Sequence, residues 1–291
     1  MESRIAERPV GEIRPGDHAA FAFATPEEQA QVIGPFLHAG LDAHEKVIYI
    51  SGGGPRQLPG LGGRPDADHL AVTGQLRVIP RGVACLTGGR FDPDRMLTVV
   101  GREISLAGAE GYAAVRLTAD MSWVLDQPGG YPLMLASEAT FDQAVTADTA
   151  LMTICQLDRN RCAPDQVSAL NDGHQIRVTA DPDFDDGVLR ITRGHAPNGL
   201  RLSGELDAAR HRPFMTALTS LGEVAGDVHL DFTHIRFLDL GTLSLLVTHA
   251  MRTPPGRVLV LDYLPVDVVR LIQSLGWHHF PGLIHGRSRH R

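Results

Sequence analysis

Residues 228–247 read VHLDFTHIRFLDLGTLSLLV, and this stretch decides how the chain is interpreted. Val228–Phe232 predicts a buried strand, which a polar break at Thr233 and His234 follows. A short apolar segment then leads to Asp239, which precedes apolar residues at helical spacing. An Asp at a helix N-cap accepts hydrogen bonds from free backbone N–H groups. Two interpretations stay open, an ordinary βα unit with a capping Asp and a helix start that receives a phosphate or a partner protein.

The size and charge of the chain limit its class. Its 291 residues suit two domains, and with 43% hydrophobic and 21% charged residues each half can bury a core. The net charge of −7 argues against a non-specific nucleic-acid binder, which needs clustered Lys and Arg. The basic cluster His285–Arg291 is interpreted as a solvated C-terminal tail. We therefore expect a globular protein without a nucleic-acid partner.

The cysteines and the distribution of apolar residues bear on the compartment. Cys85, Cys155 and Cys162 are an odd and sparse set, which favours reduced thiols over a disulfide framework. The charged, Pro-rich opening does not resemble a signal peptide, and no apolar run of about 20 residues could span a bilayer. We expect a cytoplasmic protein that has no membrane partner.

The first half begins with a βαβ pattern. Ala19–Ala24 predicts a short buried strand and Glu45–Ser51 a second one. Between them Thr25, Pro26 and Glu28 have the spacing of a helix start, with an N-cap, a proline at the first helical position and a capping-box glutamate. This order of elements is typical of a parallel sheet.

The same alternation continues to about residue 170, after a Gly- and Pro-rich loop at Gly52–Gly63. Apolar patterns predict further strands at Leu76–Pro80, Ala113–Leu117 and Leu151–Leu157, and helices from Asp92, over about Tyr131–Val145 and over Pro164–Leu170. The expected fold class is therefore α/β, with a sheet covered by helices on both faces.

The second half is smaller and follows an acidic stretch, Thr179–Gly187, which we interpret as the connection between domains. Beyond it the pattern predicts strands at Gly199–Leu206 and Arg257–Leu261, a helix after Asp207 and a helix over Pro265–Leu275. The expected domains are residues 1–180 and 187–285, followed by a basic tail at 286–291.

Several motifs of the second half resemble the STAS domain of anti-sigma factor antagonists. They are GELD at residues 204–207, LDFTHIRFLD at 230–239, and a closing helix with Leu271, Gly276 and Trp277. The resemblance covers roughly residues 187–285. It implies a protein partner, namely an anti-sigma factor or a related kinase-like regulator. In that family the Asp is followed by a Ser or Thr that the kinase phosphorylates to break the complex.

This chain departs from the family at that position, because Leu240 follows Asp239 and cannot be phosphorylated. Thr242 and Ser244 are nearby hydroxyls, but neither matches the family position. We expect the phospho-switch to be lost or displaced, and Thr242 to be an unmodified hydroxyl on the helix surface rather than a phosphorylation site. The partner-binding face implied by the resemblance comprises Asp207, Thr233, Asp239, Leu240, Thr242 and Ser244.

The first half resembles the MEDS domain, the sensory module of dichloromethane-regulator-type proteins. The motifs are Gly16-Asp17-His18, HAGLDAHEKVIYI at 38–50, TADMSWVL at 118–125 and CQLDRNR at 155–161. The region is also similar to a RecA-type or KaiC-type α/β domain without its phosphate loop. Glu27 and Glu28 stand where phosphates would bind, and the Lys and Ser or Thr of a P-loop are missing. We therefore expect no ATP hydrolysis.

Polar side chains at strand ends suggest a ligand pocket in the first domain. Asp120 ends a predicted strand, where α/β sheets present groups to ligands. The predicted pocket combines it with His18, Trp123, Glu138 and Asp158. In the alternative interpretation the roles are structural: Asp120 caps a turn, Trp123 fills a gap and Glu138 is a charge on a helix surface.

Metal and catalytic chemistry have weaker support. Cys155, Cys162 and His174 do not have the paired spacing of a structural zinc site, and Cys155 is interpreted as a small buried residue. The 14 His residues could be combined with Ser, Cys or Asp residues in many ways, and the sequence favours none of these combinations as a catalytic set. We expect no metal, no cofactor and no enzymatic activity.

The preferred hypothesis is a bacterial signalling regulator in which a sensory domain, through a small ligand or a protein, alters how a STAS domain binds its partner. A homodimer is compatible with it. The alternatives are a nucleotide-dependent, ATPase-like protein with a divergent phosphate site, and a non-catalytic scaffold of two protein-binding domains.

Overall fold

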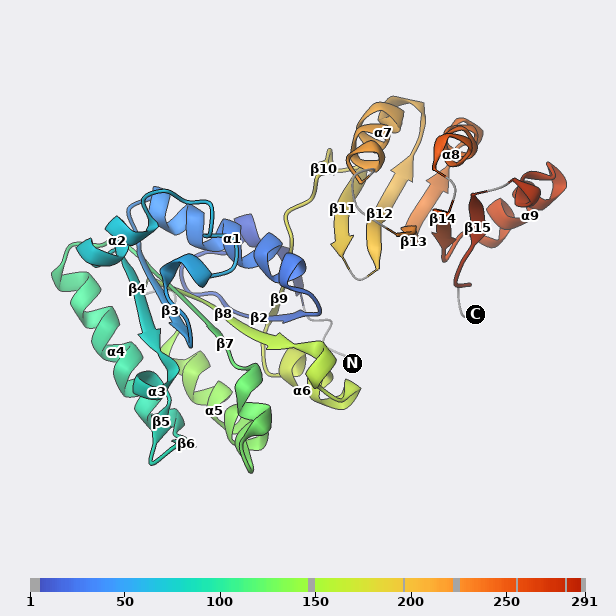
Figure 1. Cartoon of the computed structure of the whole chain (residues 1–291). Coiled ribbons are helices and arrows are strands. Elements are labelled where there is room, and N and C mark those ends of the chain that lie inside the picture. Colours follow the sequence, from blue (N-terminus) through green and yellow to red (C-terminus); the bar gives the residue numbers. More distant parts are fainter. Residues whose placement is uncertain are drawn as a thin grey trace. The chain divides into compact units, whose positions relative to one another are not determined.

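The computed structural model describes residues 6–145, 150–195, 197–221, 226–254, 256–280 and 282–288. The chain forms two compact units, divided between Ala180 and Asp181, and each unit contains its own main sheet (Figure 1). Among the described residues no helix is both long enough and apolar enough to cross a membrane.

The first unit is built on a seven-stranded sheet in which neighbouring strands are all parallel, in the order β1-β9-β2-β8-β7-β3-β4. The strands are β1 (Ala6–Pro9), β2 (His18–Phe23), β3 (Lys46–Ser51), β4 (Leu76–Pro80), β7 (Val115–Asp120), β8 (Leu151–Asp158) and β9 (Ile176–Thr179). The central strands are buried along most of their length, as a parallel sheet with both faces covered requires.

Helices cover both faces of this sheet (Figure 1). Alternate strand residues point to opposite faces, so Tyr49 packs in one core with α1, and its neighbour Ile48 packs in the other core with α4 and α5. The helices are α1 (Pro26–Asp42), α2 (Ala67–Thr73), α3 (Arg81–Ala84), α4 (Pro93–Ala109), α5 (Gly130–Ala144) and α6 (Pro164–Asp172), and a small hairpin joins β5 (Leu86–Thr87) to β6 (Arg90–Phe91). The expected α/β class is confirmed.

The predicted helix start in this unit forms with one difference. Thr25 is the N-cap of α1, and its hydroxyl accepts a hydrogen bond from Glu28 N at 3.1 Å. The Glu28 carboxylate accepts from Ala24 N at 2.8 Å, one residue before the N-cap of the usual capping box.

The second unit has a six-stranded mixed sheet in the order β10-β11-β12-β13-β14-β15. Its elements are β10 (Phe184–Asp185), β11 (Leu189–His195), β12 (Asn198–Leu206), α7 (His211–Ser220), β13 (Val228–Leu238), α8 (Leu240–Arg252), β14 (Leu259–Asp262), α9 (Val266–Ser274) and β15 (Leu283–His285). The first three strands pair antiparallel and the rest parallel. Phe214 of α7 and Leu246 of α8 belong to the single core of this unit.

One boundary prediction is wrong. The polar pair Thr233 and His234 does not end the strand, because β13 continues to Leu238. The register against β12 shifts twice, and each shift inserts one extra residue into β13, so the polar pair lies at a β-bulge. The predicted connection Thr179–Gly187 includes the division between the units, and it also contains the short strand β10, which pairs with β11.

Candidate functional site

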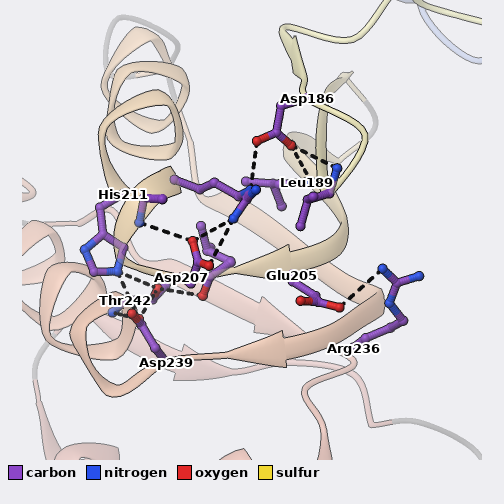
Figure 2. A network of polar contacts seen from close by, with 12 residues as sticks. Asp186, Leu189, Glu205, Asp207, His211, Arg236, Asp239 and Thr242 are labelled. Atoms are coloured by element: carbon purple, nitrogen blue, oxygen red, sulfur yellow. Dashed lines mark hydrogen bonds and ion pairs between the residues drawn. The ribbon is translucent and has the colours of Figure 1, made fainter.

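The start of α8 in the second unit carries a polar cluster around Asp239 (Figure 2). Asp239 is the N-cap, as predicted, and its Oδ1 accepts hydrogen bonds at 2.7 Å from both the backbone N and the hydroxyl of Thr242. His211, from α7, places its Nε2 2.9 Å from the same oxygen and 3.2 Å from the Thr242 hydroxyl. One carboxylate oxygen therefore joins two helices.

Thr242 is fully buried, so its interpretation as a hydroxyl on the helix surface is wrong. Its Oγ1 also lies 3.3 Å from the carbonyl oxygen of Leu206, at the end of β12. The partial burial of Asp239 would raise the pKa of its carboxyl, but hydrogen bonds from Thr242 and His211 outweigh this and lower the pKa. The carboxylate is thus held ionised at the helix N-terminus, where the dipole also favours negative charge.

Asp207 belongs to a neighbouring ion-pair network (Figure 2). Its two carboxylate oxygens lie 2.9 and 3.0 Å from the guanidinium of Arg210, which also pairs with Asp186 at 2.9 Å. Asp186 in turn accepts from the backbone N of Leu189 at 2.8 Å. Asp207 therefore helps to fix the turn between β12 and α7 against the loop before β11.

Two exposed apolar residues lie close to Asp239 in the sequence. Phe237 and Leu240 flank Asp239 in sequence, and their side chains are 50% and 53% exposed. Ser244 is also exposed, one turn further along α8. Thr233 is exposed as well, and its hydroxyl donates to Asp231 at 2.5 Å. Of the predicted face, Leu240, Ser244 and Thr233 offer side chains to a partner, whereas Thr242 does not.

A second cluster lies inside the first unit, where four potential metal ligands meet. Nε2 of His18 is 3.2 Å from Sγ of Cys155 and 3.4 Å from Oε2 of Glu138. The same Oε2 is 3.5 Å from Nε2 of His174. One ligand atom from each residue can be chosen so that all four lie within 4.8 Å of one another. Cys155 and His174, which spacing argued against as metal ligands, are thus brought together, whereas Cys162 contacts the carbonyl of Asp158 instead.

Burial dominates the electrostatics of this cluster. It raises the pKa of Glu138 to about 7, with Asp142 adding to the rise, and it raises the pKa of Cys155 well above its usual range. Burial and the neighbouring His174 lower the pKa of His18 to about 3, and burial lowers the pKa of His174 as well. Each charged form is therefore disfavoured by loss of water.

The five residues of the predicted ligand pocket fall into separate groups. His18 and Glu138 meet in the cluster just described, and Glu138 is only 7% exposed, so its interpretation as a surface charge is wrong. Asp120 caps a turn as the structural alternative predicts, because it accepts from N and Oγ of Ser122, and Ser122 Oγ accepts from Asp158 N at 2.7 Å.

Trp123 forms a third group, in which it packs edge-on against Phe91 and lies beside the guanidinium of Arg81. No hydrogen bond or ion pair among the described residues links these three groups. His211 and His174 were missing from the predicted sites, since each meets its partners only through packing of elements distant in sequence.

The position where a phosphate loop would stand is filled by protein groups. Glu28, at the start of α1, pairs with the guanidinium of Arg159 at 2.9 Å. Gln29 directly follows Glu28, and its Nε2 donates to Gln156 Oε1 at 2.7 Å. The amide of Gln156 donates in turn to the Thr118 hydroxyl at 2.7 Å. An internal carboxylate and its arginine thus take the place of an anionic ligand at this helix N-terminus.

Two family models match the chain, in this order. Residues 17–175 match MEDS, described as the methanogen/methylotroph, DcmR sensory domain. Residues 189–285 match a STAS domain model described as Mlab, STAS domain. Both predicted resemblances are confirmed, each over the half of the chain that carried the motifs.

Searches of curated proteins give no match. Among solved structures, the flagellar accessory protein FlaH from Methanocaldococcus jannaschii is similar at 11% identity and a TM-score of 0.38, covering 65% of this chain and 83% of that one. The cytoplasmic domain of EssC is similar at 7% identity and a TM-score of 0.30, covering 94% of this chain and 81% of that one.

Proposed function

The chain belongs to the MEDS family and carries a STAS domain after the MEDS domain, a combination that supports a regulatory protein. We propose that the STAS domain binds an anti-sigma factor or a related kinase-like regulator. In this proposal the MEDS domain senses a signal and changes the strength of that binding. The protein acts by association and catalyses no reaction.

The surface at the start of α8 is the observation that carries the proposal. Leu240 and Phe237 expose apolar side chains beside the ordered carboxylate of Asp239. Exposed apolar groups next to a fixed charge are typical of a protein interface, where burial of the apolar groups supplies affinity and the charge supplies specificity.

Control by phosphate at this helix start has no chemical support. Leu240 occupies the position of the family hydroxyl, and the Thr242 hydroxyl is buried and engaged by Asp239. Ser244 is the exposed hydroxyl nearby, and it already donates to the Leu240 carbonyl at 3.1 Å. The proposal therefore assigns control to the MEDS domain.

The MEDS domain contains a small, largely apolar cavity of about 30 Å³. Its walls include Met96, Met134 and Phe141, and on one side it reaches Glu138 and Cys155. Ligand sites of proteins combine apolar walls with a few polar groups in this way. The cavity is far smaller than a usual ligand pocket and does not identify the signal, so the proposed signal is a small ligand or a protein.

The docking surface can be tested by capture of partners from an extract of the native cells. The immobilised full chain is compared with Leu240→Glu, which places a charge on the proposed face. Met251→Glu is the matched control, because Met251 is 62% exposed near the opposite end of the same helix. We expect anti-sigma-type or kinase-like proteins to bind the wild type and the control, and at least tenfold less to bind Leu240→Glu.

Two results would contradict the docking proposal. One is recovery of no protein of the anti-sigma or kinase-like class. The other is equal loss with both variants, which would mean that an added charge anywhere on α8 disturbs binding.

The absence of nucleotide chemistry is a separate proposal. Because Glu28 and Arg159 already pair at the start of α1, we expect no saturable binding of MgATP at micromolar concentrations and no hydrolysis. Equilibrium binding of labelled ATP tests this. Saturable binding that Asp120→Ala weakens would favour the ATPase-like alternative instead.

A further inference from the structure

The cluster at His18 draws its four side chains from four different elements of the first unit. His18 opens β2 and Cys155 lies within β8, while Glu138 belongs to α5 and His174 follows the end of α6. In the parallel register Ala20 pairs with Cys155, so His18 lies two residues earlier on the same face of the sheet. The two helices bring the remaining ligands to that face.

The distances between the ligand atoms suit one small cation. A tetrahedral zinc site with bonds of about 2.0–2.3 Å separates its ligand atoms by roughly 3.3–3.8 Å. Three of the observed separations are 3.2 Å from His18 to Cys155, 3.4 Å from His18 to Glu138 and 3.5 Å from Glu138 to His174, and the remaining pairs lie within 4.8 Å. Small shifts of side chains would bring the four atoms around one centre.

The hydrogen bonds around the histidines have the form that metal sites use. Nδ1 of His174 lies 2.8 Å from the carbonyl oxygen of Leu170 and donates to it, so the lone pair is on Nε2, which faces Glu138. Within the described part of the chain that Nε2 has no hydrogen-bond partner. Nδ1 of His18 likewise makes no hydrogen bond to a described residue, and the carboxylate of Asp142 lies 3.6 Å from it. A small approach of Asp142 would complete a carboxylate–histidine–metal triad.

We propose that His18, Glu138, Cys155 and His174 bind one divalent cation of the zinc class. The site has two imidazole nitrogens, one sulfur and one carboxylate oxygen, a set that suits zinc and not the hard cations Mg²⁺ and Ca²⁺. A thiolate and a carboxylate together neutralise the two positive charges, so the buried site is electrically balanced. All four positions of a tetrahedron are filled by protein, which is the form of a structural site.

Bound metal would join β2, β8, α5 and the turn after α6. Because these elements are far apart in sequence, the cation would stabilise the first unit against unfolding. Removing it with a chelator should lower the unfolding temperature of that unit.

Cobalt substitution gives the most direct test. The purified full chain is stripped with a chelator and titrated with Co²⁺ and, separately, with Zn²⁺. We expect one ion per chain, and with Co²⁺ a near-ultraviolet thiolate charge-transfer band and intense visible bands of a tetrahedral complex. Cys155→Ser should abolish the thiolate band, and Cys162→Ser, the matched control, should retain it.

Affinity for Zn²⁺, measured by competition with a chromophoric chelator, tests the other ligands. Removing an outer-shell partner costs about 10–100-fold in affinity, which is the loss expected for Asp142→Asn. His174→Gln and Glu138→Gln should cost more than that, whereas exposed His69→Gln should leave affinity unchanged. Circular dichroism confirms that each variant is folded.

The proposal is overturned if the wild-type chain binds no stoichiometric Co²⁺ or shows no thiolate band. It is also overturned if the band persists in Cys155→Ser. The wild-type spectrum decides the matter by itself when a ligand variant does not fold.

Discussion

Thr242 connects three elements through one hydroxyl, which lies within hydrogen-bond distance of Asp239, His211 and the Leu206 carbonyl. Thr242→Val keeps the shape and removes these bonds, leaving buried polar partners unsatisfied. We expect the free energy of unfolding to fall by about 1–3 kcal/mol in urea denaturation. Ser244→Ala is the control, since its exposed hydroxyl should change stability by less than about 0.5 kcal/mol. A loss no larger than that of the control would contradict the role given to Thr242.

The lowered pKa of Asp239 predicts a pH dependence. Above the unfolded pKa of about 3.9 the carboxylate is ionised in both states and its stabilisation is complete. As the pH falls towards the lower folded pKa, the unfolded chain takes up the proton first and the stabilisation is lost. The Asn in Asp239→Asn still caps the helix but has no charge. The free energy of unfolding of wild type should therefore exceed that of the variant by about 1 kcal/mol at pH 7 and by almost nothing near pH 2.

Urea unfolding of both proteins at a series of pH values measures this difference. Charged groups far from Asp239 affect both proteins equally and cancel, whereas His211, which contacts Asp239, contributes to the difference. A difference that stays constant from pH 7 to pH 2 would show that the charge of Asp239 is not what stabilises the helix start.

Single residues were predictable from sequence where their partners are local. Asp239 and Thr25 cap helices through bonds to residues three positions ahead, and local patterns reveal such contacts. The burial of Thr242 and the contact from His211 depend on how α7 packs beside α8, which no local pattern records. The cluster at His18 is similar, because its four ligands are never close in sequence.

At the scale of elements, the Gly-rich loop after β3 packs closely against α1. Gly60 has φ of +76°, and a Cβ there would lie 2.5 Å from the Cα of Gly34 in the helix. Gly60→Ala should therefore lower the free energy of unfolding by about 2–4 kcal/mol, from left-handed backbone strain and overpacking. Gly63→Ala, three residues on, meets no atom within 4 Å and should change it by less than about 0.5 kcal/mol.

Chemical denaturation of the two variants and of wild type measures the change in the free energy of unfolding. Equal and small effects would mean that the loop moves away from α1 at little cost.

The elements that sequence predicted are those with strong apolar runs. The central strands and α1, α4 and α5 formed close to their expected bounds, because burial on both faces leaves a clear pattern. The short strands β1, β9 and β15 were not predicted, since they are only three or four residues long. β13 was divided in two because its bulge interrupts the alternation that marks a strand.

At the scale of the molecule, the described residues form separate cores. One core contains Phe214 and Leu246 and lies wholly in the second unit, while two others lie on the two faces of the first sheet. A core is the cooperative part of a domain, so each unit should unfold as one transition. The two-domain organisation was predicted from chain length and motifs. The strand at Phe184, which lies inside the expected connection, was not predicted.

Calorimetry on the full chain can assign each transition, because the variants above act on different units. Thr242→Val should lower only the transition of the second unit, by about 4–8 °C for each kcal/mol in a domain of roughly 100 residues. Gly60→Ala should lower only that of the first unit, by about 2–4 °C for each kcal/mol, because a larger domain unfolds with more entropy. A single transition that both variants shift equally would contradict independent cores and would mean that the two units unfold as one body.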